Sequence, residues 1–179
     1  MPDFSEVSLV IAFASFNKYT AQIDRLDDVE VARVMADYYE LATSVVRAGG
    51  GRVVKFIGDA ALLVFPEEGA DVGMQALLNL KDAADEFMVA HRWDCRLVLK
   101  VHAGTVAAGH FGDGADKRYD VLGKAVNVAA RLESSGMALS AEAFRSLGAD
   151  MRKRFKKHTP PITYIRQEDT HQARWAKRS

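Results

Sequence analysis

The order in which two hydrophobic periods alternate along the chain limits its possible folds more than any other feature. Period-two or continuous apolar runs predict strands at 7–14, 52–57, 60–65 and 96–104, and a 3.6-residue period predicts helices at 27–48 and 71–90. The order strand, helix, strand, strand, helix, strand is that of a split β-α-β-β-α-β unit. The sequence therefore predicts an α+β fold with a ferredoxin-like core, a mostly antiparallel sheet and helices packed on one face.

The first predicted helix has clear start and stop signals. Asp27 and Glu30 form a capping box, and the glycines at 49–51 suit a left-handed C-terminal cap. Its apolar stripe consists of Val31, Val34, Met35, Tyr38, Ala42, Val45 and Val46. This stripe is expected to face the sheet.

Additions to the core are predicted after residue 104. TVAAGHFG should extend the sheet, 123–136 should form a third helix ending at Gly136, and MALS should form a short strand. A helix over AEAFRSLGADMRKRF and a late edge strand, PITYIR, complete the expected domain, which covers 1–166. The polar, basic segment 167–179 is expected to be a flexible tail.

Charge and cysteine content exclude several classes of protein. The 179 residues carry 24 Lys plus Arg and 24 Asp plus Glu, so no global field favours nucleic acid or an anionic membrane as partner. The single Cys95 cannot form an internal disulfide, which fits a reducing compartment. The N-terminal apolar run follows no basic segment and is too short to span a bilayer. We expect a cytoplasmic protein, or a soluble domain of a longer one, without membrane contact.

The segment VVKFIGDAALLVF, residues 53–65, places a carboxylate between two apolar runs. A Gly-Asp pair is first of all a hairpin turn signal. In the predicted topology, however, the end of the first strand lies beside this hairpin, so residue 15 should be close to Asp59. A carboxylate there would complete a site for a hard cation. Residue 15 is a serine, so the residues alone leave both a structural turn and an incomplete metal site open.

Four segments together are similar to the signature blocks of class III nucleotidyl cyclases of the adenylate type. They are FASFNKYT (13–20), VVKFIGDAALLVF (53–65), AGHFG (108–112) and RYDVLGKAVNVAARLESSG (118–136). The similarity runs in the family's order from about residue 7 to residue 166. The last block is the most specific, because its YD, VN and AARLE stand at fixed spacing.

The resemblance implies a substrate, two metal ions and a set of roles. ATP would be converted to 3′,5′-cyclic AMP and pyrophosphate with two Mg or Mn ions. Two aspartates bind these ions in the family, and Asp59 matches the second of them. Lys55 and Asp120 match the pair that reads adenine. Asn127 matches the residue that orients the ribose, and Arg131 the one that steadies the developing phosphate charge. Because family sites combine residues of two subunits, the expected partner is a head-to-tail second copy or another cyclase chain.

The chemistry of these residues agrees with the roles that the resemblance implies. Asn127 and Arg131 are four apart on one predicted helix and share a face, and arginine offers a planar fork of donors for phosphate. A lysine donor and an aspartate acceptor match the N1 and amino group of adenine, whereas guanine presents the reverse pattern. Each residue also has a structural interpretation, as a solvated strand lysine, a turn aspartate or a surface helix pair.

Ser15 is the departure from the family pattern, which has an aspartate after Phe13 and Ala14. A serine hydroxyl can ligate Mg²⁺ but brings no charge and cannot bridge two ions. Three functions follow as alternatives. The chain is a weak adenylate cyclase, a catalytically degenerate domain that dimerises or binds nucleotide as a regulatory module, or the base-binding partner of another cyclase chain.

Overall fold

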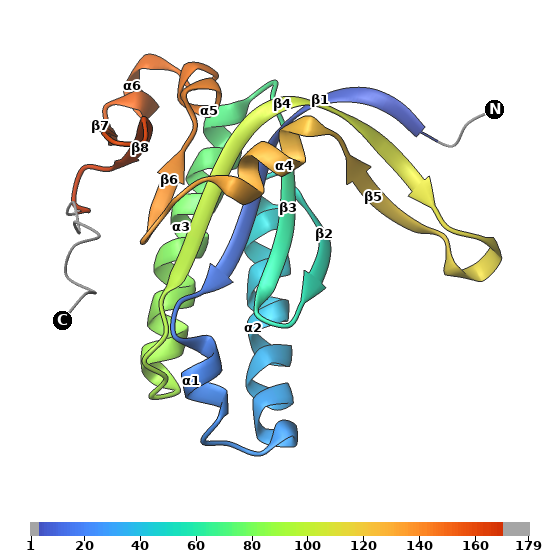
Figure 1. Cartoon of the computed structure of the whole chain (residues 1–179), viewed down its shortest axis with the longest axis vertical. Coiled ribbons are helices and arrows are strands. Elements are labelled where there is room, and N and C mark those ends of the chain that lie inside the picture. Colours follow the sequence, from blue (N-terminus) through green and yellow to red (C-terminus); the bar gives the residue numbers. More distant parts are fainter. Residues whose placement is uncertain (1–3, 170–179) are drawn as a thin grey trace.

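Two long antiparallel strands form the centre of the sheet. β1 (Phe4–Phe16) pairs with β4 (Leu97–Phe111) along its whole length, from Phe4 opposite Gly109 to Phe16 opposite Leu97. The computed structural model describes residues 4–169, which build one eight-stranded sheet in the order β2-β3-β1-β4-β6-β8-β7, with β5 beside β4 (Figure 1). Only β4 and β6 are parallel, so the expected mostly antiparallel sheet is confirmed.

The remaining elements follow the predicted order, with additions. They are α1 (Tyr19–Ile23), α2 (Asp28–Ala48), β2 (Arg52–Ile57), β3 (Ala60–Pro66), α3 (Ala70–Ala90), the 3₁₀ turn η1 (Gly114–Asp116), β5 (Arg118–Leu122), α4 (Lys124–Arg131), β6 (Met137–Leu139), α5 (Ala141–Arg145), α6 (Ala149–Arg152), β7 (Phe155–His158) and β8 (Thr163–Arg166). The split β-α-β-β-α-β core thus consists of β1, α2, β2, β3, α3 and β4.

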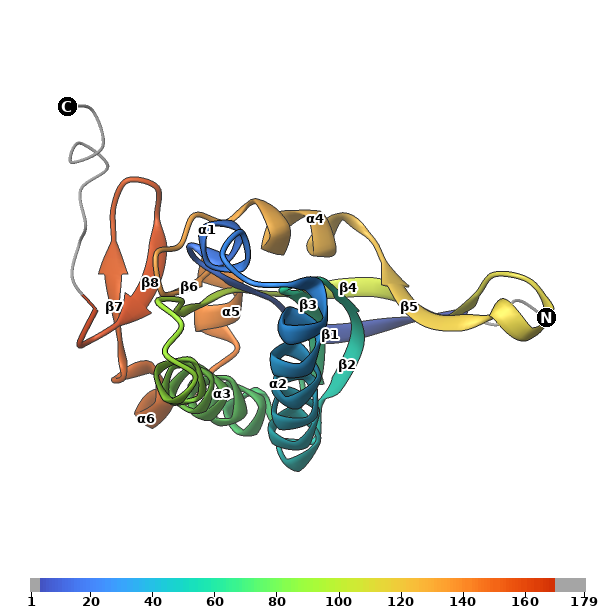
Figure 2. The ribbon, with the colours of Figure 1, turned by 90° about the horizontal axis from the view of Figure 1, so that it is seen from below.

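Helices cover the two faces of the sheet unequally. The long helices α2 and α3 lie on one face, as expected for this topology, and α4 lies on the other (Figure 2). The large core on the α2/α3 side includes Tyr38, Leu63 and Leu99, all fully buried. A smaller core under α4 includes Ile11, Val106 and Ala129. The sheet is therefore buried on both faces where β1 and β4 pass beneath α4.

Local signals explain where α2 begins and ends. The Asp27 side chain accepts a hydrogen bond from the Glu30 amide at 2.8 Å, which caps the first turn. At the other end the Gly51 amide donates to the Val46 carbonyl at 2.9 Å, while Gly50 takes a φ of +75° that glycine adopts without strain. The chain then turns directly into β2.

The C-terminal part differs from the sequence prediction in three places. The third helix ends at Arg131 and not at Gly136, because Ser134, Ser135 and Gly136 favour turns over helix. The segment predicted as one helix from Ala141 forms α5 and α6, interrupted at Gly148, and then β7. The strand predicted in 161–166 is β8, which lies between β6 and β7, so its assignment to the sheet edge was wrong. Of the predicted tail, residues 170–179 lie outside the described part of the chain.

Candidate functional site

The β2–β3 hairpin holds Asp59 against the end of β1, as the topology predicted. The Asp59 Oδ2 atom accepts a hydrogen bond from the Phe16 amide at 2.9 Å. Asp59 is half-buried, and the preceding Gly58 has a φ of +58°. The backbone at Gly58 and Asp59 therefore forms the predicted turn. The Asp59 carboxylate contacts the end of β1 and is only partly exposed to solvent.

Ser15 is the residue before Phe16 and is also half-buried. The second Asp59 oxygen, Oδ1, has no hydrogen-bond partner among the described residues, so it is available to a cation. No group of three or more His, Cys, Asp or Glu side chains within residues 4–169 could hold a metal ion. The donor set of one carboxylate and one hydroxyl fits an ion held mainly by nucleotide oxygens and water, and does not fit two ions anchored by the protein.

Phenol groups surround Asp59 on the α2 side. Burial, and secondly the Asp59 charge, raise the pKa of Tyr19, Tyr38 and Tyr39 above the ordinary tyrosine value. All three hydroxyls therefore stay protonated at neutral pH. The Tyr38 hydroxyl is buried and has no hydrogen-bond partner in the described part of the chain. The surroundings of Asp59 on this side thus carry protonated phenols, of which Tyr39 donates its hydrogen to the Gly58 carbonyl.

Lys55 and Asp120 meet across the gap between β2 and β5. The Lys55 Nζ atom lies 2.7 Å from Asp120 Oδ2, and the other Asp120 oxygen accepts from the Val121 amide at 2.8 Å. Next to this pair, the Arg52 guanidinium lies 3.7 Å from the centre of the Tyr119 ring. Two residues that the sequence predicted to act together are therefore adjacent, although 65 positions separate them.

An irregularity in β2 directs Lys55 toward β5. The register between β2 and β3 shifts between Val53 and Lys55, so that Val54 is the extra residue of a bulge. Bulges bend a strand and re-aim the side chain that follows. No turn or breaker residue marks this bulge in the sequence, because Val54 stands between Val53 and Lys55 in a segment typical of a strand.

Asn127 and Arg131 lie on α4 and are both exposed. Arg131 is the last residue of the helix, and neither side chain has a hydrogen bond or ion pair with Asp59 or Lys55 in the described residues. The structure thus brings together Asp59 with the end of β1, and Lys55 with Asp120. It leaves Asn127 and Arg131 as exposed polar groups on a separate element.

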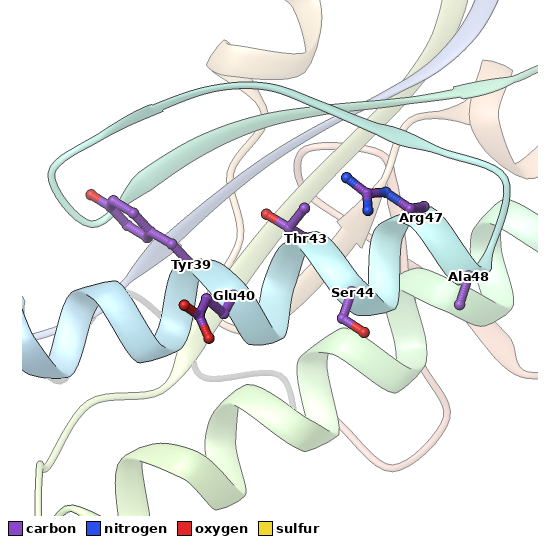
Figure 3. Close-up of a pocket in the computed structure, with 6 residues that line it drawn as sticks. All are labelled: Tyr39, Glu40, Thr43, Ser44, Arg47 and Ala48. Carbon is purple, nitrogen blue, oxygen red and sulfur yellow. The ribbon is translucent and has the colours of Figure 1, made fainter.

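A shallow groove runs along α2 beside this site. One hollow of about 570 Å³ is lined by α2 residues only, among them Tyr39, Thr43 and Arg47 (Figure 3). A smaller one of about 310 Å³ shares Thr43 and Arg47 and continues to Lys55 on β2. The larger hollow therefore lies next to the predicted nucleotide residues and not at them.

Sequence reasoning missed Arg52, Tyr119 and Tyr39 as neighbours of the site. Arg52 lies three residues before Lys55 on β2, and Tyr119 lies one residue before Asp120 on β5. Their closeness to predicted site residues was the available signal once both strands were known. Tyr39 lies beside the apolar stripe of α2, adjacent to the buried Tyr38. A large aromatic residue at the border of a helix stripe often contacts the neighbouring element with its polar end.

Comparison with known proteins identifies the class that this fold and these residues define. The sequence profile of the adenylate and guanylate cyclase catalytic domain matches residues 1–161. The chain therefore belongs to the class III nucleotidyl cyclase catalytic domain family.

Relatives of both substrate types are found. The chain is 27% identical over 133 residues to an adenylate cyclase of Anabaena cylindrica, covering 70% of this chain and 26% of that protein. It is 31% identical over 136 residues to the receptor-type guanylate cyclase gcy-23 of Caenorhabditis elegans, covering 70% of this chain and 12% of that protein. It thus spans well under half the length of these relatives.

A solved structure confirms the fold. The structure of a bacterial light-regulated adenylyl cyclase matches 95% of this chain and 54% of its own with a TM-score of 0.80, at 23% sequence identity. Within residues 4–169, no helix has the length and apolar character needed to cross a membrane.

Proposed function

We propose that this chain is an adenylate cyclase domain that converts ATP to 3′,5′-cyclic AMP and pyrophosphate, with low activity on its own. The observation that carries the choice of substrate is the Lys55–Asp120 pair at 2.7 Å. A lysine donor beside an aspartate acceptor matches the N1 acceptor and amino donor on the Watson–Crick edge of adenine. Guanine presents a donor and a carbonyl acceptor in the opposite order and would leave both protein groups unpaired.

In the reaction, the ribose 3′-oxygen attacks the α-phosphorus of the same nucleotide. A bond forms between these atoms, the bond from the α-phosphorus to the bridging oxygen breaks, pyrophosphate leaves, and the 3′-hydroxyl proton passes to solvent. Arg131 would neutralise charge on the pentavalent phosphate, and Asn127, four residues earlier on α4, would hold the ribose in line for attack. A divalent ion, Mg²⁺ or Mn²⁺, supplies charge neutralisation at the phosphates when bound beside Asp59.

The site is proposed to be completed by a second chain. Asn127 and Arg131 are exposed on α4, and within the described residues neither forms a hydrogen bond or ion pair with the Asp59 hairpin. A head-to-tail dimer would let α4 of one protomer face Asp59 of its partner, and would build two equivalent sites in a homodimer. Sedimentation is expected to show dimers, and their loss on dilution should abolish turnover.

Ser15 is the reason for expecting low activity. Two unit charges about 4 Å apart at an effective dielectric near 20 interact by about 4 kcal/mol. Losing that stabilisation from the transition state corresponds to about three decades in rate. The Asp59 hydrogen bond to the Phe16 amide further occupies one of its two oxygens, so a bound ion would rest mainly on nucleotide and water.

The test is ATP turnover with Mg²⁺ and with Mn²⁺ in the wild type and in Ser15→Asp. We expect the substitution to raise activity by up to about three decades. Ser8→Asp is the matched control, because Ser8 lies on the same strand but is exposed and about 23 Å away along it. High ATP turnover by the wild type that Ser15→Asp leaves unchanged would refute the proposal that a metal ligand is missing at position 15.

A second candidate function follows from the same vacancy. A chain that keeps Lys55, Asp120 and Arg131 but lacks one metal carboxylate could supply base and phosphate contacts to another cyclase chain that retains both aspartates. The serine at the position of one family aspartate favours this alternative over a self-sufficient enzyme. If Ser15→Asp stays inert even with Mn²⁺, this non-catalytic or partner-dependent role is the better interpretation.

A further inference from the structure

Tyr39 joins α2 to the turn that precedes Asp59. Its hydroxyl donates a hydrogen bond to the Gly58 carbonyl at 2.5 Å. Its ring stacks on Phe56 of β2, with centroids 3.9 Å apart and planes at 11°. Figure 3 shows the Tyr39 hydroxyl reaching the hairpin while Thr43 and Arg47 follow on the same side of the helix. The turn is thus fixed by a polar contact at Gly58 and an apolar contact two residues earlier.

The neighbouring Tyr38 supports the other partner of Asp59. Its ring packs edge-on against Phe16, with centroids 4.8 Å apart and planes at 69°. The Phe16 amide is the group that donates to Asp59 Oδ2. Two consecutive residues of one rigid helix therefore contact both sides of this hydrogen bond, Tyr39 through the hairpin and Tyr38 through the end of β1.

We propose that Tyr39 is a positioning residue, whose hydrogen bond to Gly58 holds the Asp59 carboxylate in the orientation in which it binds a divalent cation. This inference rests on the metal role proposed for Asp59. Groups that orient a ligating side chain typically contribute tenfold or more to metal affinity. With a serine at position 15, the orientation of the single carboxylate matters more than in a site with two.

The protonation state of Tyr39 agrees with this role. Burial and the nearby Asp59 charge raise the pKa of Tyr39, so its hydroxyl remains a donor throughout the neutral range. The Gly58 carbonyl can only accept, and Tyr39 is its hydrogen-bond donor. Removal of the hydroxyl leaves this carbonyl to water and frees the turn to move.

The test compares Tyr39→Phe with Tyr164→Phe. Phenylalanine keeps the stack on Phe56 and removes only the hydroxyl. Tyr164 is a matched control because it is also half-buried and stacked on a phenylalanine, Phe144, at 3.8 Å, but lies on β8 away from the hairpin. Three quantities are measured in each variant: the exchange rate of the Phe16 amide hydrogen, the Mn²⁺ dissociation constant in the presence of a non-reacting ATP analogue, and the free energy of unfolding.

For Tyr39→Phe we expect exchange of the Phe16 amide to accelerate about fivefold, the factor that corresponds to one lost hydrogen bond. The Mn²⁺ dissociation constant should rise about tenfold. Tyr164→Phe should change neither quantity. A similar change in both variants would reflect general loosening and would overturn the proposal.

Asp59→Ala distinguishes the metal role of Asp59 from the positioning role of Tyr39. If it abolishes Mn²⁺ binding while Tyr39→Phe binds Mn²⁺ and exchanges Phe16 like the wild type, the positioning role is wrong and the metal role stands. If Asp59→Ala binds Mn²⁺ like the wild type, the metal role is wrong and the positioning role fails with it. Faster Phe16 exchange in Tyr39→Phe would then show only that the hydroxyl holds the hairpin.

Discussion

The Lys55–Asp120 pair should matter little for folding and much for substrate choice. The two side chains are 44% and 23% exposed, and an ion pair in such surroundings contributes up to about 1 kcal/mol to stability. Lys55→Ala should therefore lower the free energy of unfolding by less than about 1 kcal/mol. Urea denaturation of the wild type and of Lys55→Ala measures this difference directly.

Base choice involves a larger free energy because a bound purine removes water from both groups. A desolvated donor or acceptor left without a partner costs about 1–3 kcal/mol. GTP would leave the Lys55 ammonium facing a donor, so its rejection by this one residue corresponds to a factor of about 5 to 150. Lys55→Ala should reduce the ratio of kcat/KM for ATP over GTP by that factor.

The assay is competition between ATP and GTP at saturating Mn²⁺, in the Ser15→Asp background if the wild type turns over too slowly. Lys153→Ala is the control, since Lys153 forms an ion pair of 2.8 Å with Asp150 on the distant α6. Equal use of the two nucleotides by the wild type, or a ratio that Lys55→Ala leaves unchanged, would refute the assignment. If Lys55→Ala lowered the free energy of unfolding by several kcal/mol, the pair would not be a weak surface ion pair.

Three further predictions concern stability. A Cβ atom at Gly51 would lie 2.4 Å from two ring carbons of the buried Phe65, so Gly51→Ala should cost about 1–3 kcal/mol in urea denaturation, and less once Phe65 is leucine. Burial lowers the pKa of His102 from 6.5. As the neutral form, its stabilising contribution is therefore complete above that pH and is lost as the pH falls below it toward the lower folded pKa, and His102→Asn should flatten this decline in stability below pH 6.5. Lys18 has a φ of +56°, a left-handed conformation that is strained for any residue other than glycine, and its ion pair with Asp94 is exposed and contributes little. Lys18→Gly should therefore stabilise the protein by about 1 kcal/mol, and a lower urea midpoint would contradict this.

The elements with strong local periodicity could be predicted from the sequence. The stripe on α2 reflects burial of one helix face, the cap at Asp27 reflects a hydrogen bond within the first turn, and the apolar run of β4 reflects a strand that is buried on both faces over much of its length. Each signal is local in the sequence, so pattern alone located these elements. The mostly antiparallel sheet followed from the order of strands and helices, and with it the contact between Asp59 and the end of β1. The approach of Lys55 to Asp120 was predicted through the family resemblance rather than through the pattern.

Other features depend on contacts that no local pattern contains. Residues 155–158 read Phe-Lys-Lys-His, and their charges suggest a helix end, yet pairing with β8 makes them an edge strand. The bulge at Val54 and the hydrogen bond from Tyr39 to Gly58 arise only when strand and helix meet. The short α1 has no apolar stripe to reveal it, and its placement after Lys18 depends on a left-handed residue.

The position of β1 between β3 and β4 has a consequence for synthesis on the ribosome. Its partners β3 and β4 end at Pro66 and Phe111, so one edge of β1 stays open until the chain has been made through α3 and β4. At about 5–20 residues per second, this interval lasts about 5 to 20 s after β1 itself is complete. An uncovered apolar strand can pair with other nascent chains during that time. The vulnerable period of this protein is therefore set by the pace of translation through α3 and β4, and not by the strength of any contact in the finished sheet.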